Sequence, residues 1–412
     1  MSDAAGSTTS VPIPPGTTER AAPADIAAAS TLLRDGIAER RTVHFAGNGT
    51  KAGWGGRLDP VDLELSTAGL NHVISHRPGD LTASVQAGLP LTHLQDVLAE
   101  HGQWLALDPA SAAAGATIGG LLATGDAGPR RLRYGTMRDL AIGATLILAD
   151  GTIAHSGSHV IKNVAGYDLT KLFHRSLGSL GLIAEVILRL HPRPPAGATV
   201  TADATVTQAA TAVPALSGSG VEPTAIEWTG PVDGGPAGRL LVRLDGSAAG
   251  VAAATGRITA LLATLSMTAD VLSGPDADQA WAGVASARHG PADASVVRAG
   301  TLPTRLPAVV GDLTRLGDQN GVTARVVSSA ALGLHTAVLS GPPHAQTVVI
   351  TAWRARVAAL GGALVVQERP EAVEAELDVL GPPPPSVAVL RAVKAQFDPD
   401  GRCGPGRFRG WF

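Results

Sequence analysis

The sequence has little cysteine, no excess of basic residues and no long apolar run. Its single cysteine, Cys403, among 412 residues excludes an intramolecular disulfide and a four-cysteine zinc or iron–sulfur site. We therefore expect a reducing compartment. Lys+Arg 32 against Asp+Glu 35 leave a net charge of −3, which argues against a nucleic-acid ligand. The longest apolar stretches, such as 141–149 and 180–190, are shorter than the roughly 18 residues that a membrane-spanning helix needs.

Glycine, in contrast, is abundant. The chain has 50 glycines in 412 residues, about 12% against a usual ~7%. Many of them gather in the first half without a fixed period, which excludes a collagen-like or solenoid chain. With 45% hydrophobic residues the chain can bury a large core, so the clusters point to loops within a folded protein.

Proline and polar segments divide the chain into four predicted stretches of an α+β protein. Residues 1–21 are rich in Pro, Ser, Thr and Ala and lack the basic and apolar regions of a signal peptide, so we expect a disordered tail. Residues 22–195 alternate helix-like and strand-like segments and end at the HPRPP cluster. Residues 196–385 predict a second α+β domain, and residues 386–412 predict a C-terminal segment that returns to the first domain.

Two local signals within the first domain are strong. Residues 91–102 (LTHLQDVLAEHG) place leucines and valine at helical spacing and stop at a glycine, which predicts a helix. The pair Asp150-Gly151 between two β-rich runs predicts a hairpin, with His155 on its second strand.

The first glycine cluster, GNGTKAGWGG (47–56), follows the strand-like TVHF directly. Glycines at a strand end let backbone amides approach a phosphate, so the loop is a candidate anion nest. Ala52 breaks the G-x-G-x-x-G spacing, and the sequence has no P-loop motif. Taken alone, this cluster equally suits an ordinary turn.

Two further clusters cover 106–135 and 160–185. The former contains TIGGLLATGDAGPRRLRYG, and the latter contains KNVAGYDLTKLF and GSLGLIAEV. The two tyrosines of the chain, Tyr134 and Tyr167, lie beside glycine in these clusters. Small residues with Thr117 and Thr124 can surround a polar ligand, but a tightly packed loop and helix start is an alternative.

This ordered set of motifs resembles the FAD-binding domain of the vanillyl-alcohol oxidase/PCMH-type FAD-linked oxidase family. ATGxxGPRR with VIKNVAGYDLTKL looks most like the FAD-binding E subunits of bacterial glycolate oxidases. The resemblance covers residues 22–195, and FDPDGRCGPGRF at the C-terminus is similar to the closing segment of the family. It implies a two-lobed FAD-binding domain, an α+β cap domain of the FAD-linked oxidase C-terminal type, and a C-terminal segment packed back on the FAD domain.

The resemblance also implies which residues hold FAD. Their backbones would surround the pyrophosphate, the ribityl chain, the flavin ring and the adenine side, which would explain the concentration of glycine. Carried over by position, the set is Ala46, Gly47, Asn48, Gly49, Thr50, Lys51, Thr117, Ile118, Gly119, Gly120, Ala123, Thr124, Gly125, Gly128, Tyr134, Gly135, Gly178, Gly181, Leu182 and Ile183.

Departures from the family pattern bear on how FAD is held. Some members attach FAD through a loop histidine or cysteine, which the corresponding loops lack here, so the resemblance implies non-covalent FAD. His44 precedes the first loop but lies in an apolar strand, where a packing role is favoured. Gly404 stands where the family often has asparagine, and Cys403 is more simply a small packing residue than a nucleophile.

The residues that would act on a substrate are less clear. Arg130 and Arg131 are substrate-side candidates because arginine binds carboxylates in a bidentate manner, although an ion pair, a phosphate contact or a solvated loop would explain them equally well. The histidine-rich HxGDGNxH element of related catalytic subunits is absent. His289, His335 and His344 share no ligand spacing, so we predict no metal site and name no catalytic base.

The resemblance leads to three functional hypotheses. The first is an FAD-binding subunit of a glycolate oxidase-like 2-hydroxy-acid dehydrogenase, which converts glycolate to glyoxylate with a second FAD-linked catalytic subunit and an iron–sulfur subunit as partners. The second is a self-sufficient FAD-dependent oxidase or dehydrogenase of a lactate-like acid, alcohol or lactone. The third is a scaffold subunit with structural FAD. We expect a cytoplasmic protein, or one held at the inner face of the cytoplasmic membrane by its partners.

Overall fold

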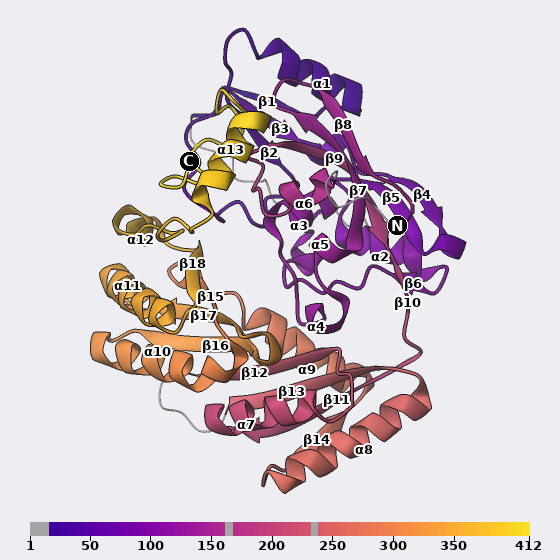
Figure 1. Cartoon of the computed structure of the whole chain (residues 1–412), viewed down its shortest axis with the longest axis vertical. Helices are drawn as coiled ribbons and strands as arrows, with labels where there is room; N and C mark the ends of the chain where they lie inside the picture. Colours follow the sequence, from indigo (N-terminus) through magenta and orange to yellow (C-terminus); the bar gives the residue numbers. More distant parts are fainter. Residues whose placement is uncertain (1–15, 161–167, 232–237) are drawn as a thin grey trace, which may run out of the picture.

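The computed structural model describes residues 16–160, 168–231 and 238–412, and these form two parts (Figure 1). The first part combines the described residues of 16–192 with the C-terminal segment 387–412. The second part runs from 196 to 379 around one large sheet. The fold is therefore a mixed α/β fold.

The first part contains two main sheets and a short strand pair. A parallel sheet has the order β1-β3-β2, and an antiparallel sheet has the order β4-β5-β9-β7-β8, while β6 pairs with β10. The strands are β1 Glu19–Ala21, β2 Val43–Ala46, β3 Leu63–Ser66, β4 Val73–Arg77, β5 Thr82–Gln86, β6 Gln103–Trp104, β7 Ala141–Leu148, β8 Ile153–Gly157, β9 Gly181–Arg189 and β10 His191–Pro192.

The helices of the first part cover these sheets. Leu94 and Leu98 of α2 and Leu121 of α3 are buried against the five-stranded sheet, as the apolar spacing in the sequence predicts. The helices are α1 Ile26–Asp35, α2 Leu91–Ala99, α3 Ile118–Thr124, α4 Arg131–Tyr134, α5 Met137–Leu140 and α6 Leu169–Phe173.

The predicted hairpin at Asp150-Gly151 is confirmed. It joins β7 to β8, Gly151 has φ +80°, and the amide of Leu148 donates to the carbonyl of Thr152 at 2.9 Å. His155 lies on β8, where its Nδ1 is 3.1 Å from Thr145 Oγ1.

The predicted disordered tail, residues 1–21, extends too far toward the C-terminus. Residues 19–21, assigned to that tail, form β1, because their backbone pairs with β3 and Arg20 Nε lies 2.8 Å from the buried Glu64 carboxylate. Residues 1–15 of the tail lie outside the described residues, as do Tyr167 and the rest of 161–167.

The second part is an eight-stranded antiparallel sheet of order β14-β11-β13-β12-β16-β17-β15-β18. Its strands are β11 Ala196–Ala204, β12 Ala225–Pro231, β13 Gly238–Gly246, β14 Ala269–Leu272, β15 Ser295–Gly300, β16 Thr323–Ser329, β17 Leu334–Ser340 and β18 Ala363–Glu368. Its helices are α7 Val206–Ser217, α8 Ala248–Thr264, α9 Gly274–Ser286, α10 Leu306–Asn320, α11 Pro343–Ala359 and α12 Glu371–Glu376.

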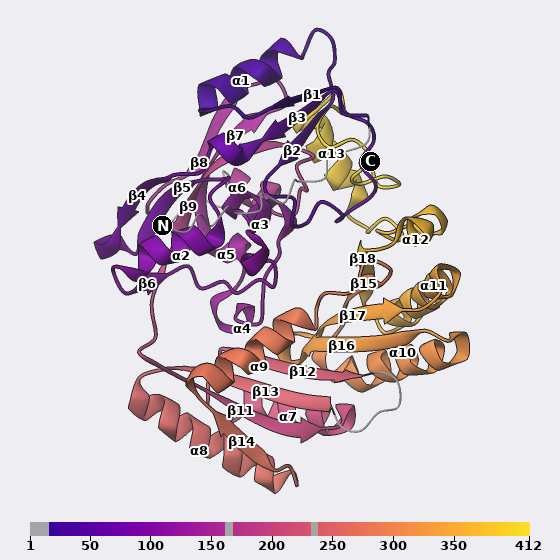
Figure 2. The same ribbon diagram turned by 180° about the vertical axis from the view of Figure 1, so that it is seen from behind.

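The two faces of this sheet differ in chemistry. Helices α7, α8, α10 and α11 bury one face, with Val297 of β15 and Val242 of β13 in the core. Because side chains alternate along a strand, Arg298 and Arg243 point to the opposite face. Figure 2 shows α9 on that opposite side, nearer the first part. That face is therefore mixed, since it carries Arg298 and Arg243 as well as Leu241 and Val327, which pack with Trp281 of α9.

The chain then returns to the first part through α13 (Val387–Phe397). Lys394 Nζ donates to the carbonyl of Ser179 at 2.7 Å, and the ring of Phe397 packs against that of Phe173. The buried Arg402 side chain donates to the carbonyls of Leu33, Arg41 and Ala149. The C-terminal segment is thus built into the first part and lies beside β2.

Candidate functional site

A cleft of about 930 Å³ lies between the strand-end loop after β2, the start of α3 and the turn before β9. This volume includes space open to solvent. The cleft is lined by fifteen of the predicted cofactor residues: Ala46, Gly47, Asn48, Gly49, Thr50, Lys51, Thr117, Gly119, Gly120, Ala123, Thr124, Gly178, Gly181, Leu182 and Ile183.

The first loop is held against the start of α3. Asn48 Nδ2 donates to the carbonyl of Gly115 at 2.8 Å, and Thr117 Oγ1, which caps α3, accepts from the amide of Gly120 at 3.2 Å. A Cβ at Gly47 would come within 2.6 Å of Thr117 Oγ1. This position therefore requires glycine for the close approach of the two segments.

The same loop offers unused donors. Within the described part of the chain, the amides of Gly47, Asn48, Gly49 and Thr50 donate to no protein acceptor. Consecutive free amides in a glycine-rich turn form a nest that suits a phosphate. The residues present therefore fit the pyrophosphate of a dinucleotide such as FAD, bound by backbone rather than by a Rossmann helix.

Five predicted cofactor residues do not line the cleft. Helix α3 ends with Gly125 in a left-handed conformation, so the chain turns away after Thr124. Beyond this turn, Gly128 packs on Asp108, Gly135 packs beside Asp139, and the ring of Tyr134 meets Trp104 and His191. The fifth residue, Ile118, is fully buried in the core.

Several residues that line the cleft are not in the predicted set of cofactor residues, among them Phe45, Trp54, Thr67, Leu177 and Arg407. Arg407 is buried, and its Nη1 donates to the carbonyls of Ala52 and Trp54 at 2.8 and 3.2 Å, which braces the first loop. Burial, with a contribution from Arg369, lowers the pKa of Arg407 to about 10. Its position in the C-terminal GPGRF motif was the available signal.

Lys51 closes one end of the cleft. Its Nζ lies 3.6 Å from Asp126 Oδ2 and 3.9 Å from Glu368 Oε1 of β18, and it sits over the ring of Trp54 at 4.8 Å. The cleft therefore ends where the two parts of the molecule meet.

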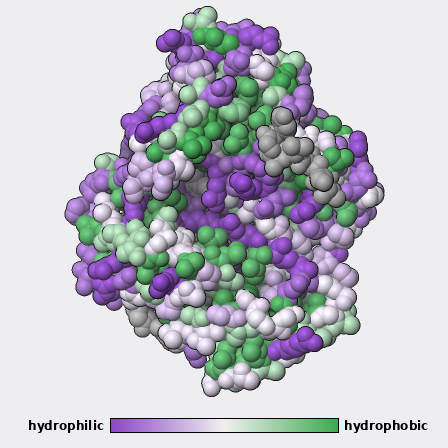
Figure 3. Space-filling view, in the orientation of Figure 1, coloured by the Kyte–Doolittle hydropathy of each residue, from purple (hydrophilic) through white to green (hydrophobic). Residues whose placement is uncertain are grey.

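A second cavity of about 1,770 Å³, which includes space open to solvent, begins at this point. Trp54, Thr124 and Leu177 line both cavities, so the two are adjacent. Figure 3 shows a hollow near the middle of the molecule, hydrophilic inside, with hydrophobic surface above and below it.

Arginines dominate the polar end of the second cavity. Arg175 of the first part and Arg298 of β15 line it, and Arg131 lies close enough to lower the pKa of Arg298. Burial is the largest cause, and together with Arg131, Arg288 and Arg175 it lowers the pKa of Arg298 to about 9. The positive charges of these neighbouring arginines destabilise one another.

Nearby carboxylates offset these charges in part: Asp126 acts to raise the pKa of Arg298, and Glu227 and Asp139 act to raise that of Arg131. Glu227 pairs with Arg288 at 2.7 Å, and Asp126 accepts from Ser111 and pairs with Lys51. Among the described residues, no carboxylate forms an ion pair with the three arginines Arg131, Arg175 and Arg298. An anion is the ligand that would relieve their mutual repulsion.

His174 lines the same cavity. Burial, and then Arg175, lower the pKa of His174 to about 4, so its imidazole is neutral at pH 7. Its Nε2 is buried without a partner in the described part of the chain.

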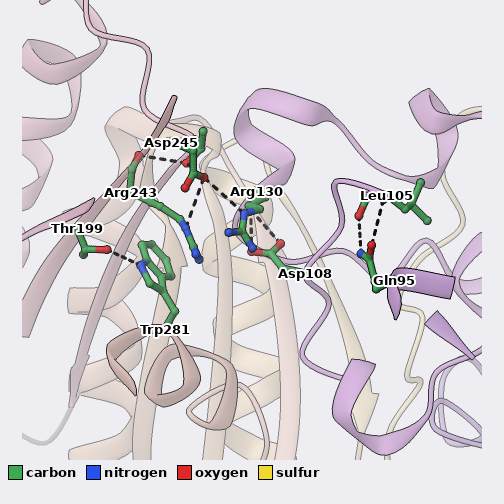
Figure 4. A network of polar contacts seen from close by, with 9 residues as sticks. Gln95, Leu105, Asp108, Arg130, Thr199, Arg243, Asp245 and Trp281 are labelled. Carbon is green, nitrogen blue, oxygen red and sulfur yellow. Dashed lines mark hydrogen bonds and ion pairs between the residues drawn. The ribbon is translucent and has the colours of Figure 1, made fainter. Parts of the chain in front are cut away.

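The two arginines predicted from sequence have different environments. Arg130 pairs with Asp108 at 3.8 Å and with Asp245 of the second part at 3.6 Å, and it stacks on Trp104 (Figure 4). Arg131 joins the arginine cluster, and burial followed by Arg175 and Arg288 lowers its pKa. Arg130 is therefore a boundary residue, whereas Arg131 lies behind the second cavity.

The other singled-out residues take structural positions. Burial lowers the pKa of His44 to about 3 and that of His335 to about 4, and His335 bonds to Ser328 and Thr301. His344 pairs with Glu376, while the backbone carbonyl of His289 accepts from Arg325. The described residues contain no group of three or more His, Cys, Asp or Glu that could hold a metal ion. None of the described helices is long and apolar enough to cross a bilayer.

Comparisons with known proteins support FAD as the ligand of the cleft. Residues 20–157 match the family model of an FAD binding domain. The chain is 38% identical over 171 residues to mitochondrial D-lactate dehydrogenase [cytochrome] 1 of Saccharomyces cerevisiae, covering 41% of this chain and 28% of that protein. It is 32% identical over 162 residues to the glycolate oxidase subunit GlcE of Escherichia coli, covering 39% and 46%. The matches thus span less than half the length of these curated relatives.

The fold as a whole also has solved counterparts. An alkyldihydroxyacetonephosphate synthase structure superposes with a TM-score of 0.70 at 16% identity, over 94% of this chain and 76% of that one. At this identity the likeness concerns the fold alone. Residues 20–157 thus match an FAD binding domain, and FAD is the cofactor that this match and the cleft support.

Proposed function

We propose that this chain is the FAD-binding subunit of a glycolate oxidase-like 2-hydroxy-acid dehydrogenase complex, which oxidises glycolate to glyoxylate. The observation that carries the proposal is the pair Arg175 and Arg298, which line the second cavity beside the FAD cleft and form no ion pair with a carboxylate among the described residues. A 2-hydroxy acid brings a carboxylate, and guanidinium groups bind carboxylates through paired hydrogen bonds. Bound FAD would accept the hydride from the hydroxyl-bearing carbon.

In this proposal the described residues divide the work. The glycine loop and the start of α3 hold FAD without a covalent bond, and Arg175 and Arg298 orient the acid at the end of the cofactor. Electrons pass on to partner subunits, since Cys403 alone cannot hold an iron–sulfur cluster. The similarity to the glycolate oxidase subunit GlcE supports a place in a multi-subunit complex, in which we propose a second FAD-linked subunit and an iron–sulfur subunit as the partners.

A second candidate is a self-sufficient dehydrogenase of a lactate-like acid. The observation in its favour is that the FAD cleft and the arginine-lined cavity lie side by side within one chain. The similarity to a D-lactate dehydrogenase supports the same class of substrate.

One experiment separates these candidates. The purified chain is loaded with FAD, and the visible flavin absorbance is followed anaerobically after glycolate or D-lactate is added. Bleaching by the isolated chain favours the self-sufficient enzyme, and bleaching only after partner subunits are added favours the complex subunit. Precipitation by acid should release the flavin into solution, because we propose that it is not covalently bound.

The arginine cluster is tested with a matched pair of variants. Arg298→Gln should weaken glycolate binding roughly tenfold or more, as expected for a lost charge-assisted hydrogen bond. Arg257→Gln removes an exposed arginine on α8 and should leave binding unchanged. Equal affinities of the two variants for glycolate would contradict the proposed role of the cluster.

A further inference from the structure

We propose that the second cavity takes a 2-hydroxy acid with an extended apolar side chain, in preference to glycolate. The inference rests on the proposed function and narrows its substrate class. The carboxylate would lie at Arg175 and Arg298, and the hydrocarbon would lie along a wall formed by α13 and the C-terminal residues.

The two ends of the cavity have opposite chemistry. One end presents the arginines and His174 next to the FAD cleft. The rest of the wall is largely apolar and comes from two neighbouring segments near the C-terminus: Val389, Leu390, Val393, Phe408, Trp411 and Phe412. A ligand that satisfies both ends must itself be amphipathic, with an acid group at one end and a hydrocarbon at the other.

The apolar wall is partly accessible: Val393 packs against the core of the first part, whereas other residues around the cavity are exposed. Val389 is 63% exposed and Leu172, across the cavity, is 43% exposed. Helix α13 has no buried residue. Large side chains so exposed around one hollow indicate a surface that a ligand covers.

The wall is also held in place. Arg391 Nε donates to the carbonyl of Trp411 at 2.7 Å, and Trp411 Nε1 donates to the carbonyl of Gly381 at 3.0 Å. The rings of Phe408 and Phe412 stack with centroids 4.9 Å apart. A preformed wall loses little conformational freedom when a ligand binds.

Size argues for more than a two-carbon acid. Glycolate offers a carboxylate to the arginines but has no hydrocarbon chain to place against Val389, Leu390 and Val393, which line the same cavity. Each additional methylene that reaches the wall should raise affinity roughly three- to fourfold through burial of apolar surface.

The test measures binding, so that it does not depend on turnover. The FAD-loaded full chain is titrated calorimetrically with acetate, butanoate, hexanoate and octanoate, which have no hydroxyl group to oxidise. We expect the dissociation constant to fall roughly three- to fourfold with each methylene. The double variant Leu172→Asn/Val389→Asn should flatten this dependence, and Arg298→Gln should weaken binding of every acid in the series.

Val271→Asn is the matched control. Val271 is 51% exposed on the edge strand β14 and lies outside the cavity, so this variant should keep the full chain-length dependence. A series without dependence on chain length in the unmodified protein would overturn the inference.

The outcomes also separate this inference from the proposed function. Flavin reduction by glycolate with a flat series would leave the function standing and remove the inference. A steep series with no reduction by any 2-hydroxy acid, even with partner subunits present, would remove the function and leave an acid-binding cavity with an apolar wall.

Discussion

Arg130 Nε of the first part lies 3.6 Å from Asp245 Oδ2 of the second part, and Asp245 also pairs with Arg243 at 3.5 Å (Figure 4). The Arg130 guanidinium stacks on the ring of Trp104 and pairs with Asp108 as well. The side chains of Arg130 and Asp245 are 15% and 6% exposed. One arginine therefore links carboxylates on both sides of the boundary along which the second cavity runs.

Breaking this contact should loosen the boundary. In a double-mutant cycle with Arg130→Met and Asp245→Asn, we expect a coupling free energy of roughly 1–3 kcal/mol, because the partners are shielded from water. The free energy of unfolding in urea measures it. The Arg239–Asp203 pair has a similar separation of 3.5 Å but is exposed, so its coupling should be less than about 1 kcal/mol. Equal coupling in the two pairs would contradict the linking role of Arg130.

Stability should depend on pH through Asp108. Burial raises the pKa of Asp108 from 3.8 to about 6, although Arg130 acts to lower it. A carboxyl whose pKa is higher in the folded state stabilises the fold when protonated, and this contribution is lost as pH rises from about 4 through 6. Asp108→Asn should remove that fall in stability, which thermal unfolding across this pH range will detect. Asp318→Asn, which removes an exposed carboxylate of α10, should retain it.

FAD retention should depend on the missing Cβ of Gly47. Gly47→Ala would place a methyl group 2.6 Å from Thr117 Oγ1 and push the first loop away from α3. We expect FAD affinity to fall tenfold or more, measured as flavin retained after gel filtration. Gly256→Ala is the control, because Gly256 lies in α8 with open space around it and alanine favours a helix. If both variants keep their flavin, the close contact is not needed for binding.

Cys403 should be unreactive in the native protein. It is fully buried, its amide donates to Asp398 Oδ2 at 2.7 Å, and burial raises the pKa of its thiol. Because the thiolate is the reactive form, we expect a thiol reagent to label the chain only after denaturation. An exposed cysteine introduced by Ala253→Cys should label at once under native conditions. Rapid native labelling of the unmodified chain would show that the C-terminal segment opens from β2.

Local sequence signals predicted those helices and turns that depend only on neighbouring residues. The helix at 91–102 appears as α2, and the turn at Asp150-Gly151 joins β7 to β8, because side-chain spacing and turn chemistry act within a few residues. The glycine clusters likewise indicated where backbones approach closely. At Gly47 the contact with Thr117 supplies the reason.

The partners of the charged residues could not be predicted in this way. Arg130 and Arg131 are adjacent in sequence, yet one pairs across the boundary and the other faces Arg175 and Arg288. Arg298, far along the chain, joins them only because strand alternation turns it to the face opposite the helices. No pattern near any of these residues marks the shared cavity.

By itself the sequence predicted the mixed helix and strand content and the glycine-rich loops, since these follow from short-range pattern, while FAD was implied by the family resemblance that its motifs carry. Only the tertiary structure decided which charges are compensated and which face the cavity. The reason is physical: a pKa, an ion pair or an apolar wall depends on groups that folding brings together from both parts of the chain. How close two such groups lie in space cannot be read from how far apart they are in the sequence.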